Sequence, residues 1–201
     1  MSDVADYAKQ LALTGRLTGP AIAQAIATLS LTPGSHGLDA GCGIGNHLVR
    51  LAEAVAPNGR VTGLDRSAEF LQIAADAVAN AGMTDHVERV SGDLDNLPFP
   101  AASFDWLWAC DCFWAGDGSQ GLSDPVATLH ECSRVLKPGG TLALLFWSDQ
   151  LLLPGYPQLE NLLRLRFSEA TFYLSASDPQ RHFLKALGWL TQAGLTDARA
   201  Q

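Results

Sequence analysis

A run of glycines between a short apolar stretch and a helical pattern constrains this chain more than any other feature. It lies in residues 36–53, which read HGLDAGCGIGNHLVRLAE. Gly37 and Leu38 lead to Asp39, alternating glycines follow, and apolar residues then recur at helical spacing. Glycine allows positive φ and removes the Cβ atoms that would keep a ligand away from the backbone. The stretch therefore predicts a strand, a tight turn and a helix whose first N–H groups are open to a ligand.

The spacing of these glycines distinguishes two kinds of nucleotide-binding turn. A dinucleotide fingerprint reads G-x-G-x-x-G, whereas Gly41, Gly43 and Gly45 alternate here and Asn46 takes the sixth place. Asp39, just ahead of the turn, would repel a pyrophosphate but suits a ligand with an ammonium or sulfonium charge. The alternative is that the glycines only allow a strand and a helix to pack closely.

The run DAGCGIG, residues 39–45, resembles the first motif of the Rossmann-like S-adenosylmethionine (SAM) methyltransferases. In that family the loop cradles the methionine end of the cofactor. The resemblance implies an α/β fold with a doubly wound, mostly parallel sheet and helices on both faces. The cofactor-binding residues that it implies in this stretch are Asp39, Gly41, Cys42, Gly43 and Gly45.

A second acidic residue follows the next expected strand. Residues 60–64 read as a strand that ends at Asp65, where a nucleotide-binding fold places an acid to accept from ribose hydroxyls. The resemblance adds Arg66 to the cofactor contacts. The alternative is that Asp65 caps the helix expected over residues 67–80, a role that Ser67 itself can fill.

The segment after a third expected strand, residues 86–90, is also acidic. Its sequence GDLDNLPFP resembles the family's third segment, in which an acidic side chain and the next backbone N–H recognise adenine. The resemblance gives these roles to Asp93 and Leu94, with an ordinary acidic loop as the alternative. It also suggests that Tyr7, in an N-terminal helical layer, contacts the cofactor, although that helix could simply pack on the sheet.

The apolar run at residues 104–109 predicts a buried fourth strand that ends at Cys110 and Asp111. Ligands of open α/β sheets bind outside the carboxyl ends of the strands. Cys110 is therefore a candidate cofactor contact, and Asp111 is the first candidate for a catalytic base, with His130 and Tyr7 as alternatives. The run lacks the N-P-P-Y and D-P-P-Y signatures of amino-methyltransferases that act on DNA bases and glutamine side chains.

A helix over residues 123–136, starting at Ser123 or Asp124, and a fifth strand at 141–147 are expected next, separated by a turn at Lys137-Pro-Gly-Gly140. The run ECSRVLKPGGTLALLFW resembles the corresponding segment of small-molecule methyltransferases. Glu131 and Arg134 stand at i and i+3 and predict a structural ion pair.

The length of 201 residues and the hydrophobic content of 47% fit one domain, residues 1–201. Its expected parts are a helical leader (1–34), a cofactor-binding core (35–147) and substrate-side helices with the start of a sixth strand (148–201). Gly15, Gly19 and Pro20 predict a break between two helices of the leader. The substrate-side part contains Tyr156, Phe172 and Tyr173 and a final helix near residues 179–193.

The end of the sequence departs from the family pattern. The family's sheet usually has seven strands and ends in an antiparallel hairpin, whereas this chain has room for five and the beginning of a sixth at Leu195. We expect a truncated chain, which a reading frame extending beyond Gln201 would support. In a naturally short chain, another element, a partner or a second copy would cover the open sheet edge.

Charge and cysteine content limit the partners. Thirteen basic and 21 acidic residues give a net charge of −8, which disfavours nucleic acid and favours a small-molecule substrate. The four cysteines show neither a disulfide pattern nor zinc-ligand spacing, and residues 130–132 of one helix point in different directions, so no metal site is expected. Reduced thiols, with no signal peptide or membrane span, predict a cytoplasmic protein.

The four ordered motifs together predict a SAM-dependent methyltransferase that acts on a small molecule, with SAM as its cofactor. Two alternatives stay open. One is a non-catalytic domain that binds SAM or a nucleotide, and the other is a nicotinamide-dependent oxidoreductase, which the glycine spacing and Asp39 disfavour.

Overall fold

The computed structural model describes residues 2–113, 121–146, 153, 155–170, 186–195 and 197–200. The chain divides into two compact units, which we describe separately. The first comprises residues 1–110 and 131–144, and the second comprises residues 111–130 and 145–201. The sheet and the glycine-rich turn belong to the first unit.

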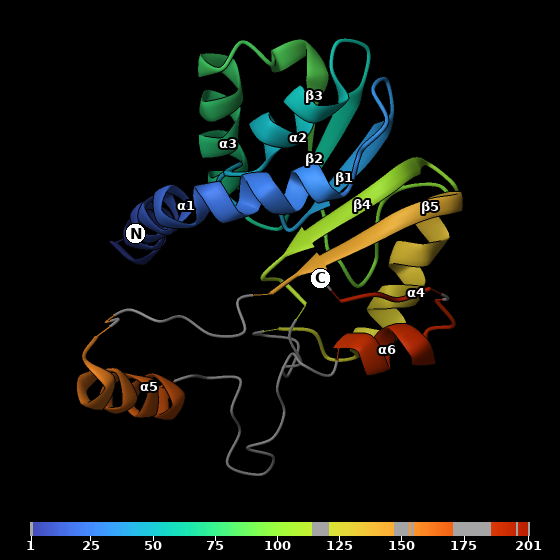
Figure 1. Cartoon of the computed structure of the whole chain (residues 1–201). Coiled ribbons are helices and arrows are strands. Elements are labelled where there is room, and N and C mark those ends of the chain that lie inside the picture. Colours follow the sequence, from blue (N-terminus) through green and yellow to red (C-terminus); the bar gives the residue numbers. More distant parts are fainter. Residues whose placement is uncertain are drawn as a thin grey trace. The chain divides into compact units, whose positions relative to one another are not determined.

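The first unit is built on a five-stranded sheet in the order β3-β2-β1-β4-β5 (Figure 1). The strands are β1 (His36–Ala40), β2 (Arg60–Asp65), β3 (Val87–Ser91), β4 (Phe104–Cys110) and β5 (Leu136–Leu145). β1 pairs in parallel with β2 and with β4, and β2 pairs in parallel with β3. The chain thus winds outward from β1 to β3 and then crosses to the other side of β1. This doubly wound α/β sheet confirms the predicted fold class.

Helices connect the strands of the first unit. They are α1 (Ser2–Thr28), α2 (Leu48–Val55), α3 (Ala68–Asn80) and the short 3-10 helix η1 (Thr84–His86). α2 packs against α1, α3 and β2, and α3 packs on β3. Apolar residues of α2 recur at helical spacing, and Leu48, Leu51 and Val55 are fully buried. The helix predicted after the glycine-rich turn and the strand predicted at residues 60–64 are confirmed.

α1 is one continuous helix, so the predicted break at Gly15, Gly19 and Pro20 is wrong. Packing outweighs the low helix propensity of these residues. A Cβ atom on Gly15 would lie 2.7 Å from Nδ2 of Asn46, so glycine lets the helix approach the glycine-rich turn closely. The same Nδ2 donates a hydrogen bond to the Leu11 carbonyl at 3.1 Å.

Gly37 of β1 lies opposite Trp106 of β4 in the sheet. A Cβ atom at this position would overlap the indole ring of Trp106. The Trp106 Nε1–H donates to Ser35 Oγ at 3.0 Å, and the His36 backbone N–H donates to Asp105 Oδ2 at 2.8 Å. These contacts fix the register of the two central strands where they begin.

β5 starts at Leu136, so the predicted turn at Lys137-Pro-Gly-Gly140 is wrong and these residues lie inside the strand. Gly139 has a φ of 80°, a conformation that favours glycine and lets the strand continue through an irregular position. A Cβ atom on Gly140 would lie 2.9 Å from the Asp105 carbonyl oxygen. Glycine here therefore permits close contact with β4 rather than a turn.

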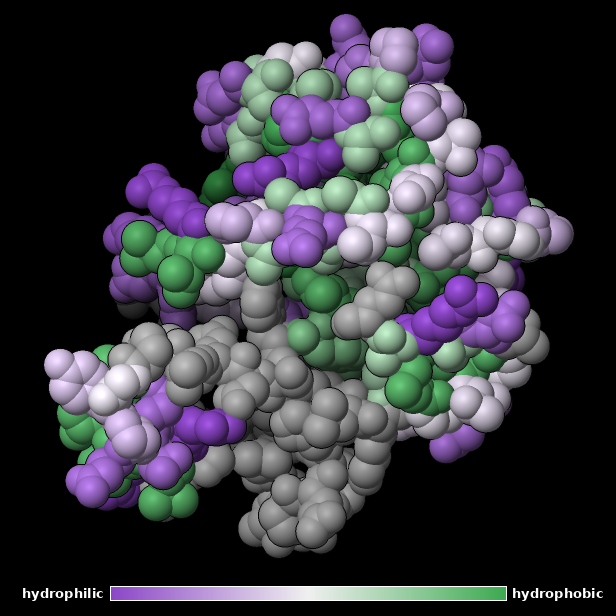
Figure 2. All heavy atoms as spheres, in the orientation of Figure 1, coloured by the Kyte–Doolittle hydropathy of each residue, from purple (hydrophilic) through white to green (hydrophobic). Residues whose placement is uncertain are grey.

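The second unit contains the beginning of α4 (Pro125–Val135), together with α5 (Pro157–Ala170) and α6 (Ala186–Gln192). Asp124 caps α4, because its Oδ1 accepts the backbone N–H groups of Val126 and Ala127, each at 3.0 Å. Glu160 is buried, and its Oε2 accepts the Leu153 N–H. Hydrophobic and hydrophilic residues lie side by side on the surface of α5 (Figure 2).

One prediction for the C-terminal part is wrong, and others concern residues outside the described ranges. Leu195 and residues 197–200 form no strand, so the sixth strand is not found where the structure describes this segment. A lone extended segment has no neighbour to satisfy its backbone hydrogen bonds. Trp147, Phe172 and Tyr173 lie outside the described residues. Among the helices that the structure describes, none is both long enough and apolar enough to cross a membrane.

Candidate functional site

The glycine-rich turn joins β1 to α2. Gly41, Gly43 and Gly45 have φ values of 78°, 53° and 82°, all in the left-handed region that favours glycine. A Cβ atom on Gly45 would lie 2.9 Å from the Cβ of Ala74 on α3, whereas one on Gly43 would meet no atom within 4 Å. Close packing, the alternative explanation of this turn, therefore accounts for Gly45. It does not account for Gly43, whose backbone is open to a ligand.

Asp65 connects the end of β2 to this turn. Its Oδ2 accepts the Gly43 N–H at 2.8 Å, and its Oδ1 accepts the Ser67 N–H at 2.9 Å. Ser67 caps α3 by accepting the Phe70 N–H at 3.1 Å, so Asp65 is not needed as the helix cap. Each carboxylate oxygen retains acceptor capacity for a ligand hydroxyl.

Asp39 is the most unusual polar residue of the site. It lies in β1 with only 1% of its surface exposed, and its Oδ2 has no hydrogen-bond partner among the described residues. Burial, together with the charge of Asp65, raises the pKa of Asp39 to about 8. A buried acceptor without a partner is unfavourable. The carboxyl therefore fits a ligand that brings a positive charge to this end of the sheet.

Cys42 holds the glycine-rich turn through its backbone N–H rather than through its thiol. Its N–H and that of Gly41 donate to the Leu64 carbonyl at 2.9 and 2.8 Å, which ties the turn to β2. Burial, assisted by the charges of Asp39 and Asp65, raises the pKa of the Cys42 thiol far above its ordinary value. The thiol is therefore neutral and unreactive. The other predicted cysteine contact, Cys110, is half-buried at the end of β4.

Asp93 follows β3 and is exposed. Its Oδ1 accepts the Asp95 N–H at 3.0 Å, and its Oδ2 lies 3.9 Å from Nη1 of Arg66. About half or more of each side chain of this ion pair is exposed, so the pair contributes little to stability. The adjacent Leu94 is half-buried. The loop is thus shaped locally by an aspartate turn, with the Asp93 carboxylate still open to solvent.

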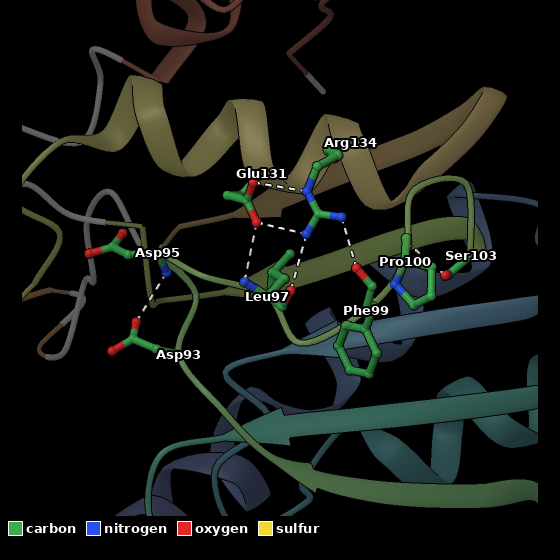
Figure 3. A network of polar contacts seen from close by, with 8 residues as sticks. All are labelled: Asp93, Asp95, Leu97, Phe99, Pro100, Ser103, Glu131 and Arg134. Atoms are coloured by element: carbon green, nitrogen blue, oxygen red, sulfur yellow. Dashed lines mark hydrogen bonds and ion pairs between the residues drawn. The ribbon is translucent and has the colours of Figure 1, made fainter.

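A polar network holds the segment that follows Asp93 (Figure 3). Arg134 and Glu131, in the last turns of α4, form the predicted ion pair at 2.8 Å, which confirms a structural role for it. Arg134 also donates to the carbonyls of Leu97 and Phe99 at 3.1 and 2.8 Å, and Glu131 accepts the Leu97 N–H at 3.3 Å. The bond from Arg134 lowers the pKa of Glu131. The network therefore fixes one end of the loop that carries Asp93.

Tyr7 lies on α1 and is 49% exposed. Its ring centroid is 5.9 Å from that of Phe70 on α3, a contact that fits the packing alternative. Asp111 and His130 belong to the second unit. Asp111 has a φ of 51°, and its N–H donates to the Leu145 carbonyl at 3.0 Å. The catalytic role predicted for Asp111 stays a prediction, as do those of His130 and Tyr7.

His47 is a site residue that the sequence did not single out. It precedes α2, and its Nδ1 accepts the Trp108 Nε1–H at 3.2 Å. Burial, assisted by the charge of Arg50, lowers the pKa of His47 to about 4. The ring is therefore neutral at physiological pH, with its proton on Nε2. Its place directly after the glycine-rich turn was the only signal in the sequence.

The structure brings the three predicted acids to one edge of the sheet. Asp39 and Asp65 lie at the carboxyl ends of adjacent parallel strands, β1 and β2, and Asp93 follows the next strand, β3. Ligands of doubly wound sheets bind at this edge. Within the described ranges, the His, Cys, Asp and Glu side chains form no group of three that could hold a metal ion. The fold and these residues define a Rossmann-like nucleotide-binding domain.

Comparison with known proteins specifies this class further. The chain belongs to the methyltransferase domain family, whose sequence model matches residues 38–140, just over half of its length. The matched residues include the glycine-rich turn and all three acids. The prediction of a SAM-dependent methyltransferase domain is thereby confirmed.

Curated relatives are demethylmenaquinone methyltransferases. The protein from Listeria monocytogenes serotype 4a (strain HCC23) is 38% identical over 128 residues, which cover 64% of this chain and 51% of the relative. The protein from Staphylococcus epidermidis (strain ATCC 12228) is 36% identical over 137 residues, which cover 68% of this chain and 53% of the relative. The chain thus spans about half the length of the curated relatives it matches.

Solved structures share the fold. A SAM-dependent methyltransferase from Aquifex aeolicus has a TM-score of 0.62 at 22% identity and matches 85% of this chain and 77% of its own. The [4+2]-cyclase SpnF has a TM-score of 0.53 at 29% identity and matches 76% of this chain and 55% of its own. At its identity level, the Aquifex structure is evidence for the fold alone.

Proposed function

We propose that this protein transfers a methyl group from SAM to a small-molecule acceptor. The observation that carries the proposal is the buried carboxyl of Asp39 near the end of β1, whose Oδ2 has no partner in the part of the chain that the structure describes. The open space at Gly43 in the following turn supports it. A cationic ligand offsets the unfavourable ionisation of such a carboxyl. A pyrophosphate would oppose that ionisation instead of offsetting it, which favours SAM over a nicotinamide dinucleotide.

Different residues of the first unit contact different parts of the cofactor in this proposal. The backbone of Gly41 and Gly43 lies beside the methionine end, Asp65 accepts from the ribose hydroxyls, and Asp93 with the Leu94 N–H recognises adenine. Further proposed contacts come from Tyr7, Cys42, Gly45, Arg66 and Cys110. When bound, the cofactor supplies an electrophilic methyl group on its sulfonium sulfur. The protein's own contribution is alignment of the acceptor and exclusion of water.

A catalytic base is required only if the acceptor must lose a proton. Asp111 is the candidate for this role. The variant Asp111→Asn keeps the shape of the side chain and removes its basicity. With an acidic acceptor group kcat should be unchanged, and with a weakly acidic one kcat should fall about 10²-fold or more. An unchanged kcat with both kinds of acceptor rejects the role.

Calorimetric titration tests the cofactor. We expect binding of SAM and of S-adenosylhomocysteine, the demethylated product, and no binding of NADH. Asp65→Asn should weaken SAM binding about tenfold or more, because an amide has one acceptor oxygen where Asp65 uses two. The matched control is Asp85→Asn, which removes an exposed carboxylate of η1. Binding of NADH with no binding of SAM would contradict the proposal.

The acceptor is tested by transfer of radiolabelled methyl groups from SAM to a panel of small molecules. Demethylmenaquinone is the first member, because the curated relatives are demethylmenaquinone methyltransferases. A second candidate function is a reaction other than methyl transfer, because the cyclase SpnF has the same fold. SAM binding without turnover across the panel would favour that candidate or a non-catalytic binding domain.

The proposal extends to location and assembly. Cys42 and Cys132 form no disulfide, which is consistent with a reducing compartment, and we propose the cytoplasm. A second copy or a partner that covers an open edge of the sheet stays a prediction. Sedimentation at several protein concentrations tests it.

A further inference from the structure

A cavity of about 520 Å³ lies between α1 and the start of α2, both in the first unit. Its lining includes Ala12, Gly15, Arg16 and Gly19 from α1, with Asn46 and Arg50 from the opposite side. None of the three acids at the strand ends lines it. It is a hollow largely open to solvent, so a bound ligand would keep part of its surface exposed.

Small residues of α1 form one wall of this cavity. Ala12, Gly15 and Gly19 follow one face of α1 at helical spacing. A Cβ atom on Gly19 would lie 3.6 Å from Nη2 of Arg50, so this guanidinium lies directly over the helix backbone. Gly15 faces the side-chain amide of Asn46 in the same way. The glycines therefore let the side chains of Asn46 and Arg50 approach α1 closely, and a larger residue at either position would displace them.

Two guanidinium groups border this space. Arg16 is three residues before Gly19 and shares its side of α1, while Arg50 reaches over Gly19 from α2. Both arginines are exposed, and in the part of the chain that the structure describes neither forms an ion pair. On a protein with a net charge of −8, two unpaired cations at one cavity make a local site of positive potential.

The visible surface of α1 is mixed in polarity. In Figure 2, hydrophilic side chains interrupt the paler surface along α1. Leu13 and Leu17, on the same helix, are 66% and 73% exposed. The arginines therefore have apolar neighbours on α1, an arrangement that suits either a soluble ligand or the headgroup of a lipid.

We propose that this cavity binds a phosphate ester, with Arg16 and Arg50 as its two cationic contacts and the Asn46 amide as a further donor. Guanidinium groups pair with phosphate oxygens through two parallel hydrogen bonds, and two of them match the double charge of a terminal phosphate. The Asn46 amide is held in place by its bond to the Leu11 carbonyl at 3.1 Å and keeps a second N–H. The ligand is either a soluble phosphoester or a phospholipid headgroup.

Two binding experiments on the full chain test the proposal and separate these sources. The first titrates the protein with pyrophosphate at constant ionic strength, followed by calorimetry. The second measures sedimentation with phosphatidylcholine vesicles that contain or lack phosphatidic acid. Binding of pyrophosphate identifies a soluble phosphoester, and binding only to the phosphatidic acid vesicles identifies a headgroup.

The decisive comparison uses the double variant Arg16→Gln, Arg50→Gln. We expect its affinity for the bound probe to fall about tenfold or more, whereas Arg89→Gln, which removes an exposed arginine of β3, keeps wild-type affinity. Circular dichroism melting establishes that each variant is folded, and Gly19→Leu, which fills the cavity and keeps both arginines, provides a second test. The proposal is overturned if neither probe binds, or if the double variant and Gly19→Leu both retain wild-type affinity.

Discussion

Replacing Asp39 with asparagine separates the charge of the buried carboxyl from its shape. Burial, and after it the charge of Asp65, raises the pKa of Asp39 to about 8 in the folded protein. An aspartate in an unfolded chain has a pKa near 4. Between these two pH values the folded protein holds a proton that the unfolded chain has released, so the free energy of unfolding falls as the pH rises from about 4 to 8.

The size of this effect follows from the pKa difference. Each pKa unit corresponds to about 1.4 kcal/mol, so a difference of roughly four units amounts to about 5 kcal/mol above pH 8. Local relaxation and water penetration reduce penalties for buried charges, and we expect about 2–5 kcal/mol. Asp39→Asn avoids the penalty. Its stability should equal that of wild type near pH 4 and exceed it by this amount near pH 9.

His47 acts in the opposite direction over part of the same range. Its pKa is lowered to about 4, chiefly by burial, so the folded protein releases a proton that an unfolded histidine keeps up to its ordinary pKa of 6.5. This group makes the free energy of unfolding rise with pH between about 4 and 6.5. The two residues offset each other in the wild-type curve. The difference between variant and wild type isolates the contribution of Asp39.

Urea unfolding at about five pH values between 4 and 9 gives the required free energies. The matched control is Asp76→Asn, which neutralises an exposed carboxylate on α3. A parallel titration with SAM should show weaker binding to Asp39→Asn at neutral pH, because the variant has no charge to offer the cofactor. Our account of Asp39 is refuted if the variant and wild type differ by a constant amount at every pH, or if the variant is less stable near pH 9.

Three further substitutions test packing in the first unit. Gly19→Ala should stabilise the protein by about 0.5–1 kcal/mol in thermal or urea unfolding, because the new Cβ meets only Arg50 Nη2 at 3.6 Å. Gly15→Ala should be about 1 kcal/mol less favourable to stability than Gly19→Ala, because the new Cβ displaces the Asn46 amide. Equal effects of the two substitutions on stability would contradict this geometry. Trp108→Phe removes the N–H bond to His47 and should destabilise by about 1–3 kcal/mol, and a smaller loss would mean that water replaces the indole.

The strands and the glycine-rich turn could be predicted because their signals are local. Alternating glycines, an apolar run and a cap such as Ser67 act over a few residues. The continuity of α1 could not be predicted, because Gly15 and Gly19 are read as breakers until the neighbours that they admit are known. The start of β5 was missed for the same reason, since Gly140 serves a close contact with β4.

Some features of the candidate site could likewise be predicted from the sequence, and others could not. The positions of Asp39, Asp65 and Asp93 follow from strand order, which the motifs indicate. The bond from the Gly43 N–H to Asp65 joins residues 22 positions apart. The lack of a partner for Asp39 Oδ2 among the described residues depends on everything packed around it. Such facts have no local sequence signal. His47 was missed because its hydrogen-bond partner, Trp108 of β4, is distant in the sequence.

The contact between Gly37 and Trp106 limits the substitutions that this domain can accept during evolution. The indole occupies the volume in which any side chain at position 37 would begin, so neither position can change freely while the other stays as it is. A homologue with alanine or a larger residue at the position of Gly37 should have a much smaller residue opposite it. Substitutions at these two positions should therefore be inherited as pairs.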